Sequence, residues 1–311
     1  MDIAFNAAAL LFLFVVLGGS AGLVVRNIKY VASALHIKLF AFGIVLGLIT
    51  TLPELSVGIN ATIDGVAALS VGNLLSGIIV IFGLILGTSL LINRRIRTGG
   101  RLAILIPEVV VMFSPVLFGL DGRYGLWDGL AMTSLYIVLI FYLYRANHSF
   151  GFSCPQILHT KKIATALLFS ILGIVFILLS SHWIVEVTIG LLDKTHINKL
   201  VIGALVFAIG TNLPEITIAI TSWRKRASGL SLSHLISSAF TNVLVLGVLT
   251  IMRPITFTVG PAFWTIAVFL AAILFLFVLF YASGKKMDRR EGLILVVIYV
   301  AFLIVNMWLL D

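Results

Sequence analysis

The chain of 311 residues is 61% hydrophobic and only 11% charged, and its mean hydropathy is +1.19. These values exclude an ordinary soluble protein and place the chain in a lipid bilayer. The formal net charge is +9, and the single cysteine, Cys154, excludes an internal disulfide and any metal site made of several cysteines.

Apolar runs long enough to cross a bilayer fill nearly the whole chain and leave no room for a soluble domain. We therefore predict an all-α polytopic membrane protein with ten transmembrane helices. In chain order, the expected spans are residues 7–25, 35–60, 66–92, 102–120, 126–144, 163–182, 198–222, 229–252, 259–282 and 292–310.

The basic residues predict how these spans are oriented. The connections after the odd-numbered spans, with the adjoining helix ends, contain all but four of the 21 Lys and Arg residues; the exceptions are Arg123, Lys194, Lys199 and Arg253. Basic residues favour the cytoplasmic side of a membrane. We therefore expect a multi-pass protein of the plasma (inner) membrane with both termini outside the cytoplasm. The positive charge then determines topology and does not indicate a nucleic-acid partner.

The sequence also divides into two related halves. The longest polar connection, residues 147–162, is expected to be a cytoplasmic linker between a first repeat, residues 1–146, and a second repeat, residues 163–311. The segment TTLPE at 50–54 recurs as TNLPE at 211–215, at a constant offset of 161 residues. Because each half has five expected spans, the second half enters the membrane upside down, as in transporters with inverted repeats.

Each repeated segment places a carboxylate, Glu54 or Glu215, next to a proline inside an apolar run. An ionisable group at bilayer depth costs about 2.5–3.5 kcal/mol on insertion scales, so two at matching positions indicate a function. Proline leaves the carbonyl four residues earlier without its helical donor, and Thr50 and Thr211 lie one turn before the carboxylates. Such a set of oxygens suits a hard cation.

Other polar residues near the two segments have alternative roles. Thr50, Thr51, Thr211 and Asn212 could supply neutral oxygens or could bond to carbonyls of their own helix. Ser238 and Asn242 lie one turn apart on the following span and could face the same site or hold helices together. Glu108 and Glu186 are expected at the membrane interface, and His234 is expected to be a packing residue. No motif indicates an enzyme or a cofactor.

The two segments resemble the sodium/calcium exchanger family of the cation/calcium antiporter superfamily, in its prokaryotic form. That family has two inverted repeats, each with G-T-S-L-P-E followed by a span with G-N-x-x-G-S and a downstream Asn or Asp. Residues 208–215, AIGTNLPE, are close to this pattern; residues 48–54, LITTLPE, are more divergent, and Gly72-Asn73 follows at the family spacing. The resemblance covers essentially the whole chain.

The resemblance implies an antiporter that exchanges Ca2+ for Na+ by alternating access, with Glu54 and Glu215 as the central calcium ligands. The additional oxygens for Na+ would come from Thr50, Thr51, Thr211 and Ser238. The chain departs from the family where Ile49 replaces a glycine, Asn212 replaces a serine, and Gly77 and Ile81 replace two polar residues. The loss of oxygens in the first half predicts altered coupling, with fewer Na+ per Ca2+ or with H+ in place of Na+.

The expected function is therefore cation antiport, and the expected partners are inorganic cations and the lipid bilayer. The main alternative is exchange of Ca2+ or another cation for H+. An alternative of a different class is a membrane sensor or scaffold of the same fold that no longer transports, because the first half lacks two oxygen groups. A channel is not indicated, since no charged ring or filter-like loop is evident.

Overall fold

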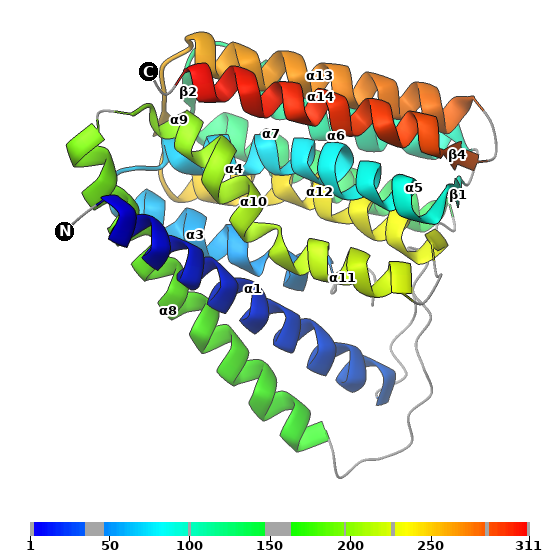
Figure 1. Ribbon diagram of the computed structural model, residues 1–311, viewed down its shortest axis with the longest axis horizontal. Coiled ribbons are helices and arrows are strands. Elements are labelled where there is room, and N and C mark those ends of the chain that lie inside the picture. The colour runs from blue at the N-terminus through cyan, green and yellow to red at the C-terminus, as the bar shows by residue number, and fades with distance from the viewer. Residues whose placement is uncertain are drawn as a thin grey trace.

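The structure, a computed structural model, describes residues 3–34, 47–98, 101–146, 163–195, 197–224, 228–283 and 286–309. The predicted linker at 147–162 and the beginning of the predicted span at 35–60 lie outside these ranges. The described chain is mostly helical (Figure 1). Seven of its helices are long and apolar enough to cross a bilayer, and a bent pair makes an eighth.

The helices of the first half follow three of the predicted spans, 66–92, 102–120 and 126–144, to within two residues, but the helix predicted at 7–25 extends over Ile3–Ala34. They are α1 (Ile3–Ala34), α3 (Leu52–Ile63), α4 (Ala68–Ile79), the π-helix η1 (Val80–Leu86), α5 (Gly87–Asn93), α6 (Leu102–Phe118) and α7 (Leu126–Arg145). The second half contains α8 (Ile163–Thr195), α9 (Lys199–Ile202), the π-helix η3 (Gly203–Phe207), α10 (Ala208–Thr211), α11 (Leu213–Arg224), α12 (Ser228–Met252), α13 (Pro261–Ala282) and α14 (Arg289–Trp308).

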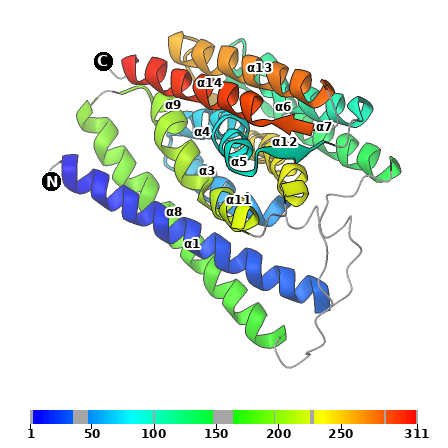
Figure 2. The same ribbon diagram turned by 45° about the vertical axis from the view of Figure 1, so that its right-hand side comes forward.

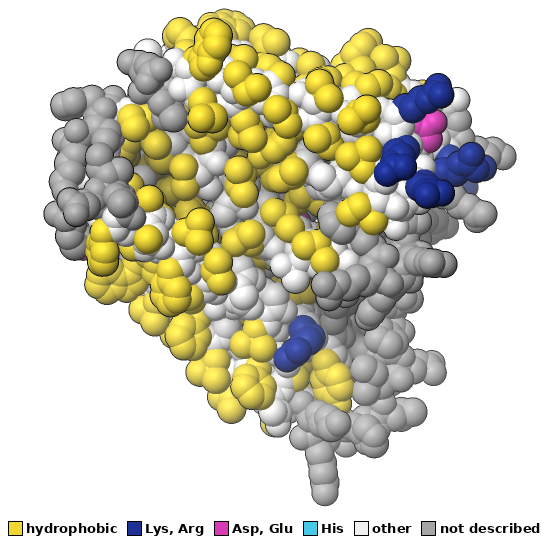
Figure 3. All heavy atoms as spheres, viewed as in Figure 1, with side chains coloured by type: hydrophobic (Ala, Val, Ile, Leu, Met, Phe, Trp, Pro, Cys, Tyr) yellow, Lys and Arg dark blue, Asp and Glu magenta, His cyan; other side chains and the backbone are white. Residues whose placement is uncertain are grey.

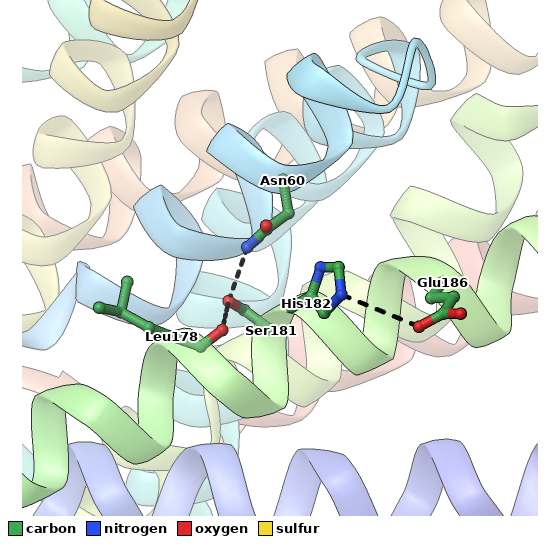
Figure 4. A network of polar contacts seen from close by, with 5 residues as sticks. All are labelled: Asn60, Leu178, Ser181, His182 and Glu186. Carbon is green, nitrogen blue, oxygen red and sulfur yellow. Dashed lines mark hydrogen bonds and ion pairs between the residues drawn. The ribbon is translucent and has the colours of Figure 1, made fainter.

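Helix α8 continues to Thr195, although its span was predicted to end at residue 182. The polar residues in this extension do not interrupt the helix. His182 and Glu186 lie one turn apart on an exposed face, with Nε2 3.9 Å from Oε2 (Figure 4). Glu186 is exposed, whereas Glu108 of α6 is only 2% exposed because neighbouring helices cover it. The interfacial depth expected for both residues stays a prediction.

Four short strands, which an all-α prediction does not include, join the two halves at the ends of the bundle. Strand β1 (Arg95–Arg97) pairs antiparallel with β4 (Lys286–Asp288), and β2 (Arg123–Tyr124) pairs antiparallel with β3 (Ile255–Thr256). The two pairs lie at opposite ends of the molecule (Figure 1). Strands of two or three residues have no usable periodicity, so the sequence could not reveal them.

Both repeated segments interrupt their helices in the same way. In the first half, the helix that contains Thr50 stops at Thr51, and α3 begins with Pro53 in its first turn. In the second half, α10 ends at Thr211 and α11 begins at Leu213, with a bend of 41° between the two parts. The backbone at the break has φ −92° and ψ 8° at Thr51, and φ −81° and ψ 9° at Asn212. Proline favours both breaks, because it fits a first turn, whereas in a helix interior it removes one backbone hydrogen bond and crowds the preceding turn.

The helices around these breaks form the centre of the bundle. The run from α4 to α5 and helix α12 are the most deeply buried, whereas α7, α8 and α14 present rows of exposed apolar side chains. Hydrophobic side chains cover most of the face in Figure 3, as expected for a surface in contact with lipid. Exposed basic residues, including Arg95, Lys286 and Arg290, gather at the end that carries β1 and β4 (Figure 3).

Two glycines let α4 cross the second half at very short range. A Cβ atom on Gly72 would lie 2.2 Å from the carbonyl oxygen of Leu200, and one on Gly203 would lie 2.2 Å from that of Leu69. Small residues at such crossings allow helices to approach closely without a hydrophobic driving force. This crossing holds the first half against the segment that leads into the second repeated motif.

Helices α1 and α8 pack against each other and form an oblique pair along one edge of the bundle (Figure 1 and Figure 2). A polar contact joins this pair to α3. Ser181 of α8 lies 2.5 Å from the Ser56 hydroxyl, and Asn60 Nδ2 donates to Ser181 Oγ at 2.9 Å. Figure 4 shows Asn60 pointing down from α3 onto Ser181.

Candidate cation site

The first repeated motif places its polar groups at the break before α3. Glu54 lies in the first turn of α3, and its side chain is 1% exposed. The Thr50 hydroxyl lies 3.0 Å from the carbonyl oxygen of Gly47, and the Thr51 hydroxyl lies 3.2 Å from the same oxygen. Both threonines therefore donate to a carbonyl oxygen of their own helix, which is one of the two roles that the sequence predicted for them. A hydroxyl that donates in this way still has lone pairs to offer to a cation.

The second motif is arranged similarly around Glu215, which is fully buried at the beginning of α11. The Thr211 hydroxyl lies 3.0 Å from the carbonyl oxygen of Phe207 and 3.1 Å from Asn73 Oδ1 of α4. Asn212 Nδ2 donates to the carbonyl oxygen of Ala208 at 2.8 Å. Asn73 was not among the predicted site residues, although its place in the Gly72-Asn73 pair was a signal that could have identified it.

The two motifs meet crosswise in the middle of the bundle. The Glu54 carboxylate lies near the Thr211 hydroxyl of the other half and interacts electrostatically with Glu215. Glu215 in turn lies near the Thr50 hydroxyl of the first half. Ser238 of α12 donates to Glu215 Oε1 at 2.8 Å. Each carboxylate therefore lies near a hydroxyl from the opposite half.

The remaining predicted residues lie beside this group with different contacts. Asn242 Nδ2 donates to the carbonyl oxygen of Leu74, at 3.3 Å, and not to a carboxylate. The hydroxyl of Thr51 bonds to backbone of its own helix. All eight predicted residues are at most 2% exposed. They are Glu54, Glu215, Thr50, Thr51, Thr211, Asn212, Ser238 and Asn242.

Several buried oxygen atoms in this group have no hydrogen-bond partner among the described residues. They are Glu54 Oε2, Glu215 Oε2, Asn212 Oδ1 and Asn242 Oδ1. A buried acceptor without a donor costs about 1–3 kcal/mol, and more if it is charged. No Lys or Arg whose side chain the structure describes is buried, so the two carboxylates have no buried basic partner among those residues. The arrangement therefore offers anionic and neutral oxygens suited to a hard cation.

The family model described as "Sodium/calcium exchanger protein" matches residues 5–145 and 165–308. The chain belongs to the sodium/calcium exchanger family. The two matches cover both halves of the chain and include both motifs, so membership does not depend on one repeat alone.

One curated relative is the "Sodium/calcium exchanger MaX1" of Methanosarcina acetivorans, with 32% identity over 136 residues, which are 43% of this chain and 39% of that protein. Among solved structures, the sodium-calcium exchanger NCX_Mj gives a TM-score of 0.67 at 20% identity, covering 96% of this chain and 98% of the other. The H+/Ca2+ exchanger CAX gives a TM-score of 0.76 at 15% identity, covering 98% of this chain and 87% of the other. This chain therefore has the fold of both exchangers.

Proposed function

We propose that this member of the family is a secondary active antiporter that exchanges Ca2+ for Na+, with its ion site at the bilayer midplane. The observation that carries the proposal is the meeting of Glu54 and Glu215, two buried carboxylates with unpartnered oxygens and no buried Lys or Arg among the residues whose side chains the structure describes. A buried pair of like charges is strongly unfavourable unless cations or protons neutralise it. Cation binding would remove this penalty.

The proposed ligands are the eight residues of the candidate site. Glu54 and Glu215 supply the charge, and the hydroxyls of Thr50, Thr51, Thr211 and Ser238, with the amide oxygens of Asn212 and Asn242, supply neutral ligands. The crossed contacts of Thr50 and Thr211 support this assignment, because they bring both halves to both carboxylates. Thr51 has the weakest support, since its contacts are to its own helix.

The proposed architecture is ten spans in two inverted repeats, residues 1–146 and 163–311, with 147–162 as a cytoplasmic linker and both termini outside the cytoplasm. The matching backbone angles at Thr51 and Asn212 support a repeat. The two strand pairs also support it, because each joins one half to the other at opposite ends of the bundle. The described ends of α1 and α14 that are nearest the termini lie at the same end (Figure 1).

Alternating access then follows from the electrostatics of the site. When cations neutralise the carboxylates, the loaded site can change its exposure from one side of the membrane to the other. When the site is empty, two bare charges in a low-dielectric interior oppose the same movement. The antiporter would therefore exchange ions and would not leak them.

Exchange of Ca2+ for H+ is the second candidate function. It is favoured by the same pair, because two protons can neutralise two carboxylates as well as a divalent cation can. The two functions differ in their driving ion, although they need the same residues. Substituting Glu54 or Glu215 would impair both functions and would not distinguish them. Comparing Ca2+ uptake driven by a Na+ gradient with uptake driven by a pH gradient would distinguish them.

The test is uptake of radioactive Ca2+ into vesicles that contain the purified protein. Vesicles loaded with Na+ and diluted into Na+-free buffer at equal pH are expected to accumulate Ca2+, whereas vesicles with equal Na+ on both sides are not. Uptake driven by a pH gradient without Na+ would select the H+ alternative. Absence of uptake under either gradient would contradict antiport and favour the sensor or scaffold.

A further inference from the structure

The corner of the site next to Gly77 is filled by two amide groups. A Cβ atom on Gly77 would lie 3.0 Å from Asn242 Nδ2 and 3.2 Å from Asn212 Nδ2. Asn212 and Asn242 come from different helices, the break before α11 and the middle of α12. The absence of a side chain at Gly77 therefore creates no empty space, because the second half fills it.

Hydrogen bonds fix which atoms of these amides face the corner. Asn212 Nδ2 donates to the carbonyl oxygen of Ala208, and Asn242 Nδ2 donates to that of Leu74. A carbonyl oxygen can only accept, so rotating either amide by 180° would place two oxygens against each other. The nitrogen atoms of both amides, and not their oxygens, therefore lie at the Gly77 corner, and the positive end of an amide dipole repels a cation.

The charge available to cations is correspondingly small. Glu54 and Glu215 are the carboxylates that interact with each other. Glu108, the other buried glutamate of the described chain, has no electrostatic interaction with them. The remaining site groups are neutral hydroxyls and amides. When both glutamates are ionised, the site has a charge of −2, which one Ca2+ or two monovalent cations neutralise.

We propose that Asn212 and Asn242 close the Gly77 corner to cations, so that the site carries either one Ca2+ or two monovalent cations and the exchange is electroneutral. This inference rests on the proposed antiport and specifies its stoichiometry. A third monovalent cation would need an oxygen-lined position, and the corner presents amide nitrogens. It would also give the loaded site a net charge, which is costly in a low-dielectric interior.

The membrane potential distinguishes this stoichiometry from one with a third Na+. Vesicles with the purified protein and an outward Na+ gradient are clamped near zero or near 100 mV, inside positive or inside negative, with K+ and valinomycin. We expect Ca2+ accumulation at steady state to be independent of the potential. A third Na+ would move one net charge per cycle and would change the accumulation by about 50-fold per 100 mV.

That potential dependence would overturn the inference while leaving antiport intact. Absence of Ca2+ uptake under Na+ and pH gradients would instead contradict the proposed function, so the two failures are distinguishable. A tenfold Na+ gradient at zero potential gives a second readout, because two Na+ per Ca2+ support an accumulation of about 100-fold and three support about 1,000-fold.

Substitutions at the corner test the role of the amides directly. In Gly77→Ser the new Cβ would displace both amides, and we expect Ca2+ uptake to fall about tenfold or more. Removing one amide in Gly77→Ser/Asn212→Ser gives the hydroxyl space and should raise uptake above that of Gly77→Ser, although below the wild type because the amide oxygen of Asn212 is lost, and should make uptake dependent on potential. Gly19→Ser is the matched control, since nothing lies within 4 Å of a Cβ there. A double variant whose uptake rises but stays independent of potential would contradict the assigned role of the corner.

Discussion

Glu54 and Glu215 each lie near a hydroxyl of the opposite half, that of Thr211 and Thr50 respectively. The two threonines occupy equivalent positions in the repeated motif, so the contacts are related by the repeat. This arrangement means that either half alone would present one carboxylate with an incomplete set of oxygens. The site therefore depends on the association of the halves.

Replacing Thr211 by valine removes one of these hydroxyls with little change in volume. We expect the dissociation constant for Ca2+ to rise about fivefold, because one neutral oxygen contributes about 1 kcal/mol. Titration calorimetry on the purified protein measures this change. Thr188→Val is the matched control, because Thr188 is buried in α8 and its hydroxyl bonds to the carbonyl oxygen of Ile184. Equal effects of the two substitutions would contradict a ligand role for Thr211.

For individual residues, the sequence predicted which types of side chain lie together but not how those side chains are oriented. The recurrence of proline and glutamate was sufficient to place Glu54 and Glu215 in related positions, because a buried carboxylate beside a helix break has few structural explanations. The positions of Asn212 and Asn242 against Gly77 could not be predicted. They depend on how α4 and α12 are rotated about their axes, and the apolar pattern of buried helices does not specify rotation.

Close backbone contacts position the helices next to the second motif. Gly72 and Gly203 bring α4 against the π-helix η3, which leads directly into the second motif. A π-helix widens the turn and is common near functional sites. The sequence showed the small residues on α4 but gave no sign of η1 or η3, because a π-turn has no distinct residue pattern.

Substituting Gly72 by alanine should separate these elements. Its Cβ would lie 2.2 Å from a backbone carbonyl oxygen of Leu200, which cannot move as a flexible side chain would. We expect a loss of stability of about 2 kcal/mol or more, measured as a lower Tm in detergent. Gly19→Ala should leave the Tm nearly unchanged, since its Cβ meets nothing within 4 Å. An unchanged Tm for Gly72→Ala would show that the crossing is not close.

The contact between α3 and α8 is expected to be weaker. Ser181→Ala removes the shared partner of Ser56 and Asn60 and should cost about 0.6 kcal/mol, the average for polar contacts between membrane helices. Ser170→Ala is a control on the same helix, because the Ser170 hydroxyl bonds to the carbonyl oxygen of Ala166. Thermal unfolding of both variants in one detergent measures the difference. A larger loss for Ser170→Ala would contradict the contact.

The whole molecule has a distinct basic end and an apolar flank. Exposed Arg and Lys side chains lie around β1 and β4, which are at the end of the bundle away from the termini (Figure 1 and Figure 3). The positive-inside rule predicts that this end faces the cytoplasm. Composition and charge were sufficient for this prediction, since a bilayer restricts long apolar segments to spanning helices. Pairing of the short strands required the tertiary structure.

Thiol labelling in intact cells tests the orientation. A membrane-impermeant maleimide should not label native Cys154, which lies in the predicted cytoplasmic linker, until the cells are permeabilised. In a Cys154→Ser background, Arg123→Cys should be labelled without permeabilisation, because Arg123 is exposed at the opposite end, in β2. Labelling of Cys154 and not of Arg123→Cys in intact cells would show the reverse orientation.

The central claim is that one cation is bound jointly by Glu54 and Glu215, and calorimetric titration of Ca2+ into the purified protein tests it most directly. The wild type should bind one Ca2+ with competition by Na+. Glu54→Gln and Glu215→Gln should each weaken binding about 30-fold or more, because a lost buried charge partner costs about 2 kcal/mol at least. Glu186→Gln, on the exposed face of α8, should bind as the wild type does. Wild-type affinity in both Glu54→Gln and Glu215→Gln would contradict the account.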